Sequence, residues 1–170
     1  MGTKLRLIVV TGVALALGVV SFASAADNKK DGRKKVTINL TSRVGQEAEL
    51  DLGATGFTVG DRFVFSDDIF RNGRNVGLLG GECTTVRILP QPLPAGQEPQ
   101  SSTVNCVVTL DLGKGQVTGQ ALLTFSQETQ GRPFTFAVTG GTGPYRTAHG
   151  QARVTETSET ESRIKLKLIL

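Results

Sequence analysis

From Val36 to the C-terminus, apolar and polar residues alternate with a period of two, and this pattern constrains the fold class more than any other feature. A β-strand places successive side chains on opposite faces, so such alternation is typical of strands with one buried face. In the segment 103–112, the residues that share one face are Val104, Cys106, Val108, Leu110 and Leu112. No stretch of this region shows the capped 3.6-residue period of an amphipathic helix. The sequence therefore predicts an all-β domain.

Glycine, proline and Asn-Gly signals divide the region into nine segments, from which we expect about eight antiparallel strands. Asn72-Gly73 is the strongest hairpin signal, because a type I′ turn needs positive φ at both central residues. Four of the six prolines lie within 90–102, which predicts an irregular loop. The expected strand segments are 36–42, 48–52, 61–70, 76–89 with a bulge at Gly80-Gly81, 103–112, 116–127, 133–139, 148–157 and 163–170. A closed barrel and a two-sheet sandwich both satisfy this pattern.

The first 25 residues have the pattern of a secretory signal peptide. Lys4 and Arg6 precede an apolar run, and residues 21–25 end in small side chains at Ala-x-Ala spacing. The apolar run has about 14 residues, whereas about 20 span a bilayer, so we expect no stable membrane anchor. An uncleaved anchor is the alternative. We expect cleavage near Ala25, secretion, a flexible basic tail over 26–35 and one domain over 36–170.

The charge balance argues against nucleic acid as a partner. Removal of Lys4 and Arg6 with the signal peptide leaves 17 Lys and Arg against 15 Asp and Glu. The clustered basic residues lie within 29–35, in a stretch without aromatic side chains or periodicity, which is typical of a solvated tail.

Cys83 and Cys106 are the two cysteines of the chain. Thiols outside the cell tend to oxidise, so export predicts a disulfide between them. A catalytic thiol is the alternative, and it requires that one cysteine stays reduced. A single His and two cysteines do not suggest a metal site.

Asp67 is the strongest candidate for acid–base chemistry. It shares one face of its predicted strand with Phe63, Phe65 and Ile69. Aromatic surroundings desolvate a carboxylate and raise its pKa, which suits a proton donor or acceptor. The alternative is that Asp67 bonds backbone N–H groups near the Asn72-Gly73 turn.

Two further titratable residues have an ambiguous orientation. Glu82 falls on a mostly apolar face with Leu78 and Ile88, but a bulge at Gly80-Gly81 would reverse this assignment. His149 alternates with polar residues, which favours a solvent-exposed face, although a polar patch inside a barrel would give the same pattern.

The order of several motifs between Val59 and Thr157 resembles the allene oxide cyclase and dirigent superfamily of small eight-stranded barrels. The motifs are Gly60-Asp61, Ser66–Phe70, Val76-Gly77, Gly80-Gly81-Glu82-Cys83, Phe134–Val138, Gly140-Gly141-Thr142-Gly143-Pro144-Tyr145 and Ala148-His149-Gly150-Gln151. The resemblance implies a single antiparallel β-barrel with an apolar lumen. It also implies cyclisation, isomerisation or stereoselective coupling of an apolar small molecule without a cofactor, in a homotrimer or homodimer. A non-catalytic barrel that binds a hydrophobic ligand or a partner protein is the alternative.

The resemblance also suggests site residues. Asn39 matches a water-binding Asn of the cyclases, although Thr37 replaces their neighbouring Glu. Asp67 and Cys83 match cavity positions, and His149 stands where dirigent proteins carry a functional Arg. We therefore predict Asp67, His149 and Asn39 as catalytic residues. The predicted ligand-binding residues are Phe63, Phe65, Glu82, Phe136 and Tyr145.

Overall fold

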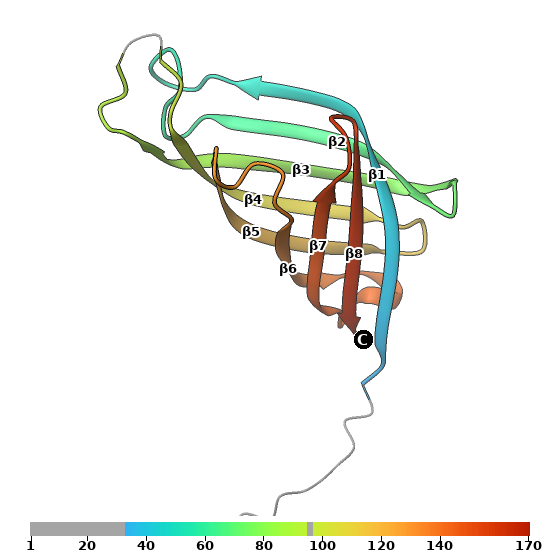
Figure 1. The fold of residues 1–170 in the computed structure, drawn as a ribbon. Coiled ribbons are helices and arrows are strands. Elements are labelled where there is room, and N and C mark those ends of the chain that lie inside the picture. Colours follow the sequence, from blue (N-terminus) through green and yellow to red (C-terminus); the bar gives the residue numbers. More distant parts are fainter. Residues whose placement is uncertain (1–32, 95–96) are drawn as a thin grey trace, which may run out of the picture. The chain divides into compact units, whose positions relative to one another are not determined.

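The described part of the chain is a closed, eight-stranded antiparallel β-barrel (Figure 1). The structure is a computed structural model, and it describes residues 33–94 and 97–170. The predicted signal peptide and most of the tail lie outside these residues. The strands are β1 Lys35–Leu50, β2 Arg62–Arg71, β3 Arg74–Leu89, β4 Ser101–Asp111, β5 Gln116–Ser126, β6 Phe134–Gly141, β7 His149–Glu156 and β8 Glu161–Ile169, with a 3-10 helix η1 at Gly143–Tyr145. The predicted barrel is confirmed and the sandwich is excluded.

Each strand pairs with its neighbour in sequence, and β8 closes the barrel against β1. At one end, which we call the packed end, the connections are 72–73, 112–115 and 142–148. At the opposite end, which we call the mouth, they are 51–61, 90–100, 127–133 and 157–160. The start of β1 and the end of β8 lie side by side at the packed end (Figure 1), where Lys34 and Leu170 exchange two backbone hydrogen bonds.

Inward-facing aliphatic side chains fill the packed end. The buried members of this core are Ile38, Leu40, Ile69, Leu110, Val117, Val138, Ala148, Ile164, Leu166 and Leu168. They come from most of the strands because alternate residues of every strand point into the lumen. Full burial of one such side chain contributes about 1.5–3 kcal/mol. This core therefore closes one end of the barrel.

The Asn72-Gly73 hairpin is confirmed, since Asn72 has φ 52° and Gly73 has φ 77°. The division of the first strand is wrong. Segment 36–42 and residues 48–50 of the second segment belong to one strand, β1, with a bulge between Val44 and Gln46. Gly45 lies in this bulge, where a Cβ atom would come within 2.7 Å of the Ser66 carbonyl oxygen. Because Gly45 has no side chain, β1 approaches β2 closely at the bulge and pairs with it on both sides.

The predicted bulge at Gly80-Gly81 is also wrong. Both glycines continue the regular register, with Gly80 opposite Ser66 and Gly81 opposite Phe65. A Cβ atom on Gly81 would lie 2.7 Å from the Phe65 ring. Gly81 is therefore the small residue that leaves room for an inward-pointing ring.

Cys83 and Cys106 form the predicted disulfide, with an S–S distance of 2.01 Å. They lie directly opposite each other on β3 and β4. No free cysteine remains among the described residues, so the alternative of a catalytic thiol is contradicted. Within the same part of the chain, no helix is long and apolar enough to cross a membrane.

Candidate functional site

The lumen contains a cavity of about 640 Å³ that extends from the core of the packed end to the mouth. Apolar side chains from all eight strands make most of its wall. They include Leu79, Val104, Val108, Leu110, Val117, Leu123, Val138, Ala152, Val154, Ile164 and Leu166. The aliphatic core forms the floor, and the barrel wall forms the sides. The interior is thus neither filled completely nor open at both ends.

Phenylalanine rings line the cavity wall between its aliphatic floor and the mouth. Phe63 and Phe65 are stacked, with ring centroids 5.6 Å apart, and Phe134 and Phe136 meet edge to face at 6.0 Å. Phe125 completes this group of rings. Aromatic walls of this kind bury large flat areas of a ligand and favour stacked or edge-to-face contacts.

Two glycines of the barrel wall reduce the crowding of the lumen. Gly119 of β5 lies opposite Val108, and a Cβ atom on Gly119 would lie 3.3 Å from Val108 Cγ2 and 3.5 Å from Phe136 Cβ. On β3, Gly81 makes the same kind of space for the Phe65 ring. A protein interior is otherwise packed as densely as an organic crystal, so these missing side chains account for part of the empty volume.

Asp67 of β2 is the half-buried carboxyl group of the cavity wall. Its Oδ2 accepts a 2.6 Å hydrogen bond from the hydroxyl of Ser42, which is buried on β1. Desolvation raises the pKa of Asp67 above its usual value; the Ser42 bond opposes this effect, and the negative charge of Asp68 adds to it. The alternative that Asp67 bonds backbone N–H groups near the turn is not supported, because its hydrogen bond comes from the Ser42 hydroxyl. The neighbouring Asp68 accepts a hydrogen bond from Asn75 on the outer face. Asp67 is thus a carboxyl group with a raised pKa that faces an apolar space.

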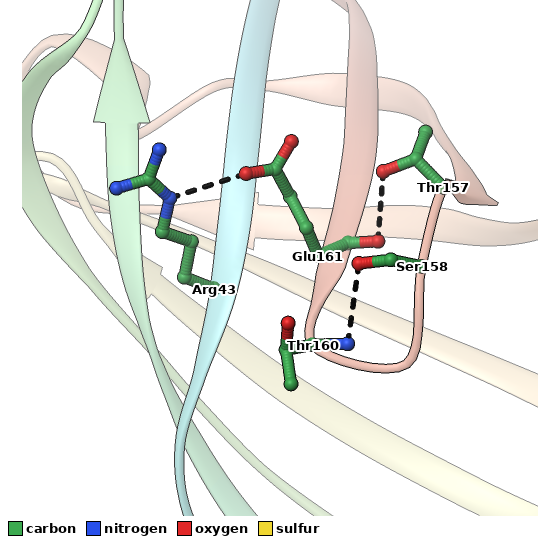
Figure 2. A network of polar contacts seen from close by, with 5 residues as sticks. All are labelled: Arg43, Thr157, Ser158, Thr160 and Glu161. Carbon is green, nitrogen blue, oxygen red and sulfur yellow. Dashed lines mark hydrogen bonds and ion pairs between the residues drawn. The ribbon is translucent and has the colours of Figure 1, made fainter.

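The β7–β8 hairpin and β1 form one side of the mouth (Figure 2). The Glu161 carbonyl accepts a hydrogen bond from the Thr157 hydroxyl, and the Glu161 carboxylate pairs with Arg43 Nε at 3.2 Å. Thr160 donates from its backbone N–H to Ser158, and its carbonyl accepts from the backbone N–H of Val44. These contacts tie the hairpin to β1 and hold this edge of the opening in place.

Asp61 organises another connection at the mouth. Burial tends to raise the pKa of its carboxyl, but hydrogen bonds from the backbone of Thr58, the backbone of Leu52 and the Thr58 hydroxyl outweigh it, so the pKa is lowered. The charged carboxylate therefore links both ends of the segment 52–61.

The predicted site residues separate into two groups. Asp67, Phe63, Phe65 and Phe136 line the cavity, as do both cysteines. The other predicted members, His149, Asn39, Glu82 and Tyr145, do not.

Strand alternation explains why the second group lies elsewhere. His149 is exposed on β7, with Arg33 3.5 Å from its Nε2 and the Thr147 carbonyl 3.2 Å from its Nδ1. Asn39 lies in a groove on the outer surface. Glu82 shares the face of Leu78, as predicted, but this face of β3 is the outer one, because Leu78 is 50% exposed and Glu82 pairs with Arg62. Asp67 and His149, both predicted as catalytic residues, therefore do not face the same space.

Tyr145 belongs to η1 and packs against the core of the packed end. Its position follows from the Gly140–Tyr145 corner, where Gly143 has φ 56° and a Cβ atom on Gly141 would lie 2.3 Å from the Gln116 carbonyl oxygen. The glycines permit the tight connection between β6 and β7 that contains Tyr145.

Sequence reasoning did not identify several polar residues of the cavity. Ser42, Glu47, Glu156, Ser158, Glu159, Glu161 and Ser162 all line it. The signal for Ser42 was present, since it has the same parity as Ile38 and Leu40 on β1. Glu47 follows the bulge in β1, so its orientation could not be counted from the start of the strand.

These observations define the class of protein: a closed antiparallel barrel whose cavity opens at one end. A family model described as an allene oxide cyclase barrel like domain matches residues 36–168, and the chain belongs to this family. No curated protein sequence matches the chain significantly.

Solved structures share this fold. A structure of a pyocyanin demethylase is 31% identical, with a TM-score of 0.65, and the match covers 78% of this chain and 99% of the other. An exo-specific intermolecular Diels–Alderase is 13% identical, with a TM-score of 0.63 and coverage of 81% and 98%. A pterocarpan synthase dirigent protein is 13% identical, with a TM-score of 0.53 and coverage of 81% and 84%. The last two likenesses concern the fold alone.

Proposed function

We propose that this protein is a secreted barrel that binds an apolar, aromatic small molecule in its cavity and exchanges a proton with it through Asp67. The observation that carries this proposal is a half-buried carboxyl group, held by one hydroxyl, in the wall of an apolar cavity. The cavity volume of about 640 Å³ falls within the range of roughly 300–1,000 Å³ that is usual for small-molecule sites.

The chemistry that such a site supports is a proton-coupled rearrangement. The Asp67 carboxyl gives its proton to a nitrogen or oxygen atom of the ligand, and the resulting carboxylate takes a proton from another ligand atom. The ligand is isomerised or cyclised, and Asp67 returns to its initial state without a co-reactant. The walls restrict the conformations of the ligand, which lowers the entropic part of the barrier.

Similarity to the pyocyanin demethylase supports an aromatic ligand, because this neighbour is about one third identical over nearly its whole length. Pyocyanin is therefore a suitable first probe. It changes colour on protonation, so its visible spectrum reports both binding and proton exchange.

The test compares Asp67→Asn with Asp68→Asn. The two carboxyl groups are neighbours in sequence, but Asp68 faces outward and bonds Asn75, which makes it a matched control. We expect wild type and Asp68→Asn to bind pyocyanin and to shift its protonation equilibrium. Asp67→Asn should bind without this shift. If pyocyanin binds and all three proteins give the same spectrum, the proton-exchange role of Asp67 is wrong.

The alternative function is ligand binding without catalysis, which the closed aromatic walls favour equally. Native mass spectrometry of protein recovered from culture medium tests it by revealing a co-purified apolar molecule. N-terminal sequencing of the same material tests secretion, with a first residue near Ala26 expected. The mass of the intact assembly distinguishes the predicted homotrimer or homodimer from a monomer.

A further inference from the structure

We propose that the cavity selects cationic aromatic ligands over neutral and anionic ligands of the same shape. This inference rests on the proposed function, since it names the substrate class of the same cavity. It follows from the sign of the charges that line the apolar space.

Every charged residue that lines the cavity is acidic. These residues are Glu47, Asp67, Glu156, Glu159 and Glu161. Within the described part of the chain, no Lys, Arg or His belongs to the cavity wall. Glu47 and Glu156 share the inward parity of their strands, because Glu47 lies opposite Phe65 and Glu156 opposite Ser162. A ligand that enters through the mouth thus meets negative charge before it reaches the rings.

The composition of the protein does not explain this bias, because the whole chain has more basic than acidic residues. The basic residues of β7 and β8 lie on the opposite face of the same sheet. Arg153, Arg163, Lys165 and Lys167 line a separate groove on the outer surface, together with Asn39 of β1. Strand alternation therefore separates the charges, with acids inside the mouth and bases outside.

Most of the acidic charge at the mouth is not neutralised by the protein. Glu161 pairs with Arg43, whose guanidinium also lies 4.4 Å from the centroid of the Phe70 ring, outside the cavity. Among the described residues, neither Glu47, Glu156 nor Glu159 has a basic partner. These carboxylates are exposed, so each attracts a cation weakly, but their effects add where solvent is partly excluded.

The cavity wall below the mouth suits the aromatic rings of a cationic ligand. The stacked pair of Phe63 and Phe65 presents π-electron density to the cavity, and a delocalised cation over an aromatic face is attracted to it. Asp67 supplies a carboxyl group deeper in the same wall. An anionic ligand, in contrast, would face like charges at the mouth and would lose its hydration in an apolar space.

The experiment measures the affinity of the mature protein for three flat probes with the same fused rings. N-methylphenazinium is cationic, phenazine is neutral and phenazine-1-carboxylate is anionic. We expect the cation to bind about tenfold more tightly than phenazine, and the anion to bind most weakly. Raising the salt concentration from 20 to 500 mM should reduce the affinity for the cation alone, because ions screen exposed charges.

Two triple variants test whether the acidic residues at the mouth cause the preference for the cation. The triple variant Glu47→Gln, Glu156→Gln, Glu159→Gln should lose most of the preference for the cation and should bind phenazine within about twofold of wild type. The control triple variant Asp68→Asn, Glu82→Gln, Asp111→Asn removes equal charge from residues that neither line the cavity nor belong to the connections of the mouth, and it should keep the preference.

If the wild type binds phenazine as tightly as N-methylphenazinium, or more tightly, the inference is overturned. The proposed function stays intact in that case. Equal loss of preference in both triple variants would also overturn the inference, since net charge rather than the mouth would then be responsible. If none of the three probes binds, the proposed function itself fails.

Discussion

The packed end and the mouth of the barrel are built from the same eight strands, yet different interactions hold them together. At the packed end, buried Ile, Leu and Val side chains meet across the lumen. Towards the mouth, Phe rings stand around a cavity, and the Cys83–Cys106 disulfide joins two strands of the wall. Hydrophobic burial stabilises the first region, whereas the second leaves part of its apolar surface unburied.

This difference indicates how the fold combines stability with an empty lumen. A cavity forfeits the dispersion contacts and apolar burial that its volume would otherwise supply. The disulfide restricts the unfolded chain and compensates in the region where packing is incomplete. The comparison predicts that the two ends respond differently to mutation.

Removal of the disulfide should have the largest effect. The bond closes a loop of residues 83–106, for which the chain-entropy model gives about 3.5 kcal/mol of stability. We expect the double variant Cys83→Ala, Cys106→Ala to lose about this amount in urea unfolding. A loss of stability below about 1 kcal/mol would show that the hydrogen-bonded ladder of β3 and β4 alone holds the wall.

Truncation in the core should have the next largest effect. Leu168 is 2% exposed and does not line the cavity, so Leu168→Ala should lower the free energy of unfolding by about 3 kcal/mol. Its affinity for a cavity ligand should stay nearly unchanged. Leu122→Ala is the control, because Leu122 is 68% exposed and its truncation should cost about 0.5 kcal/mol or less.

Gly81→Ala should separate ligand binding from stability. The added methyl group would displace the Phe65 ring towards the cavity, since a Cβ atom there lies 2.7 Å from the ring. We expect a stability loss of about 1 kcal/mol and about tenfold weaker binding of an aromatic probe. Calorimetric titration measures the affinity, and unchanged binding would mean that this ring does not border the bound ligand.

The smallest effect concerns the pH dependence of stability. The pKa of Asp67 is raised in the folded protein, so folding favours its protonated form, and stability falls as the pH rises above the unfolded pKa and through the folded pKa. Asp67→Asn should therefore melt at a higher temperature than wild type at neutral pH, and the difference should vanish in acid. Asp68→Asn should show no such pH-dependent gain.

Sequence reasoning predicted the strands well where the alternation was uninterrupted. The inward faces of β4, β5 and β6 follow directly from their period, and Asn72-Gly73 identified a tight hairpin. The predictions were wrong at Gly45 and at Gly80-Gly81, because a glycine permits both a bulge and a close approach of a neighbouring strand. Only the packing of the neighbouring strand distinguishes the two.

The candidate site was predicted in part for the same reason. Parity placed Asp67 on one strand face with two rings, and the resemblance implied that this face lines a lumen. The structure places Asp67, Phe63, Phe65 and Phe136 on the cavity. His149 and Asn39 were taken from the family resemblance, and they lie on the outer surface of the barrel. A shared motif position identifies a strand and a register, but it does not show that two polar side chains meet.

The sequence by itself determined the all-β class, the inward faces of most strands and the pairing of the two cysteines. These properties depend on local periodicity, turn chemistry and the number of cysteines. The order of its motifs, through the family resemblance, also implied a closed barrel. Only the tertiary structure decided that the lumen is filled at one end and empty at the other, and that acidic residues collect at the mouth. Each of these depends on which side chains from distant strands share the same space, and local periodicity carries no information about that space.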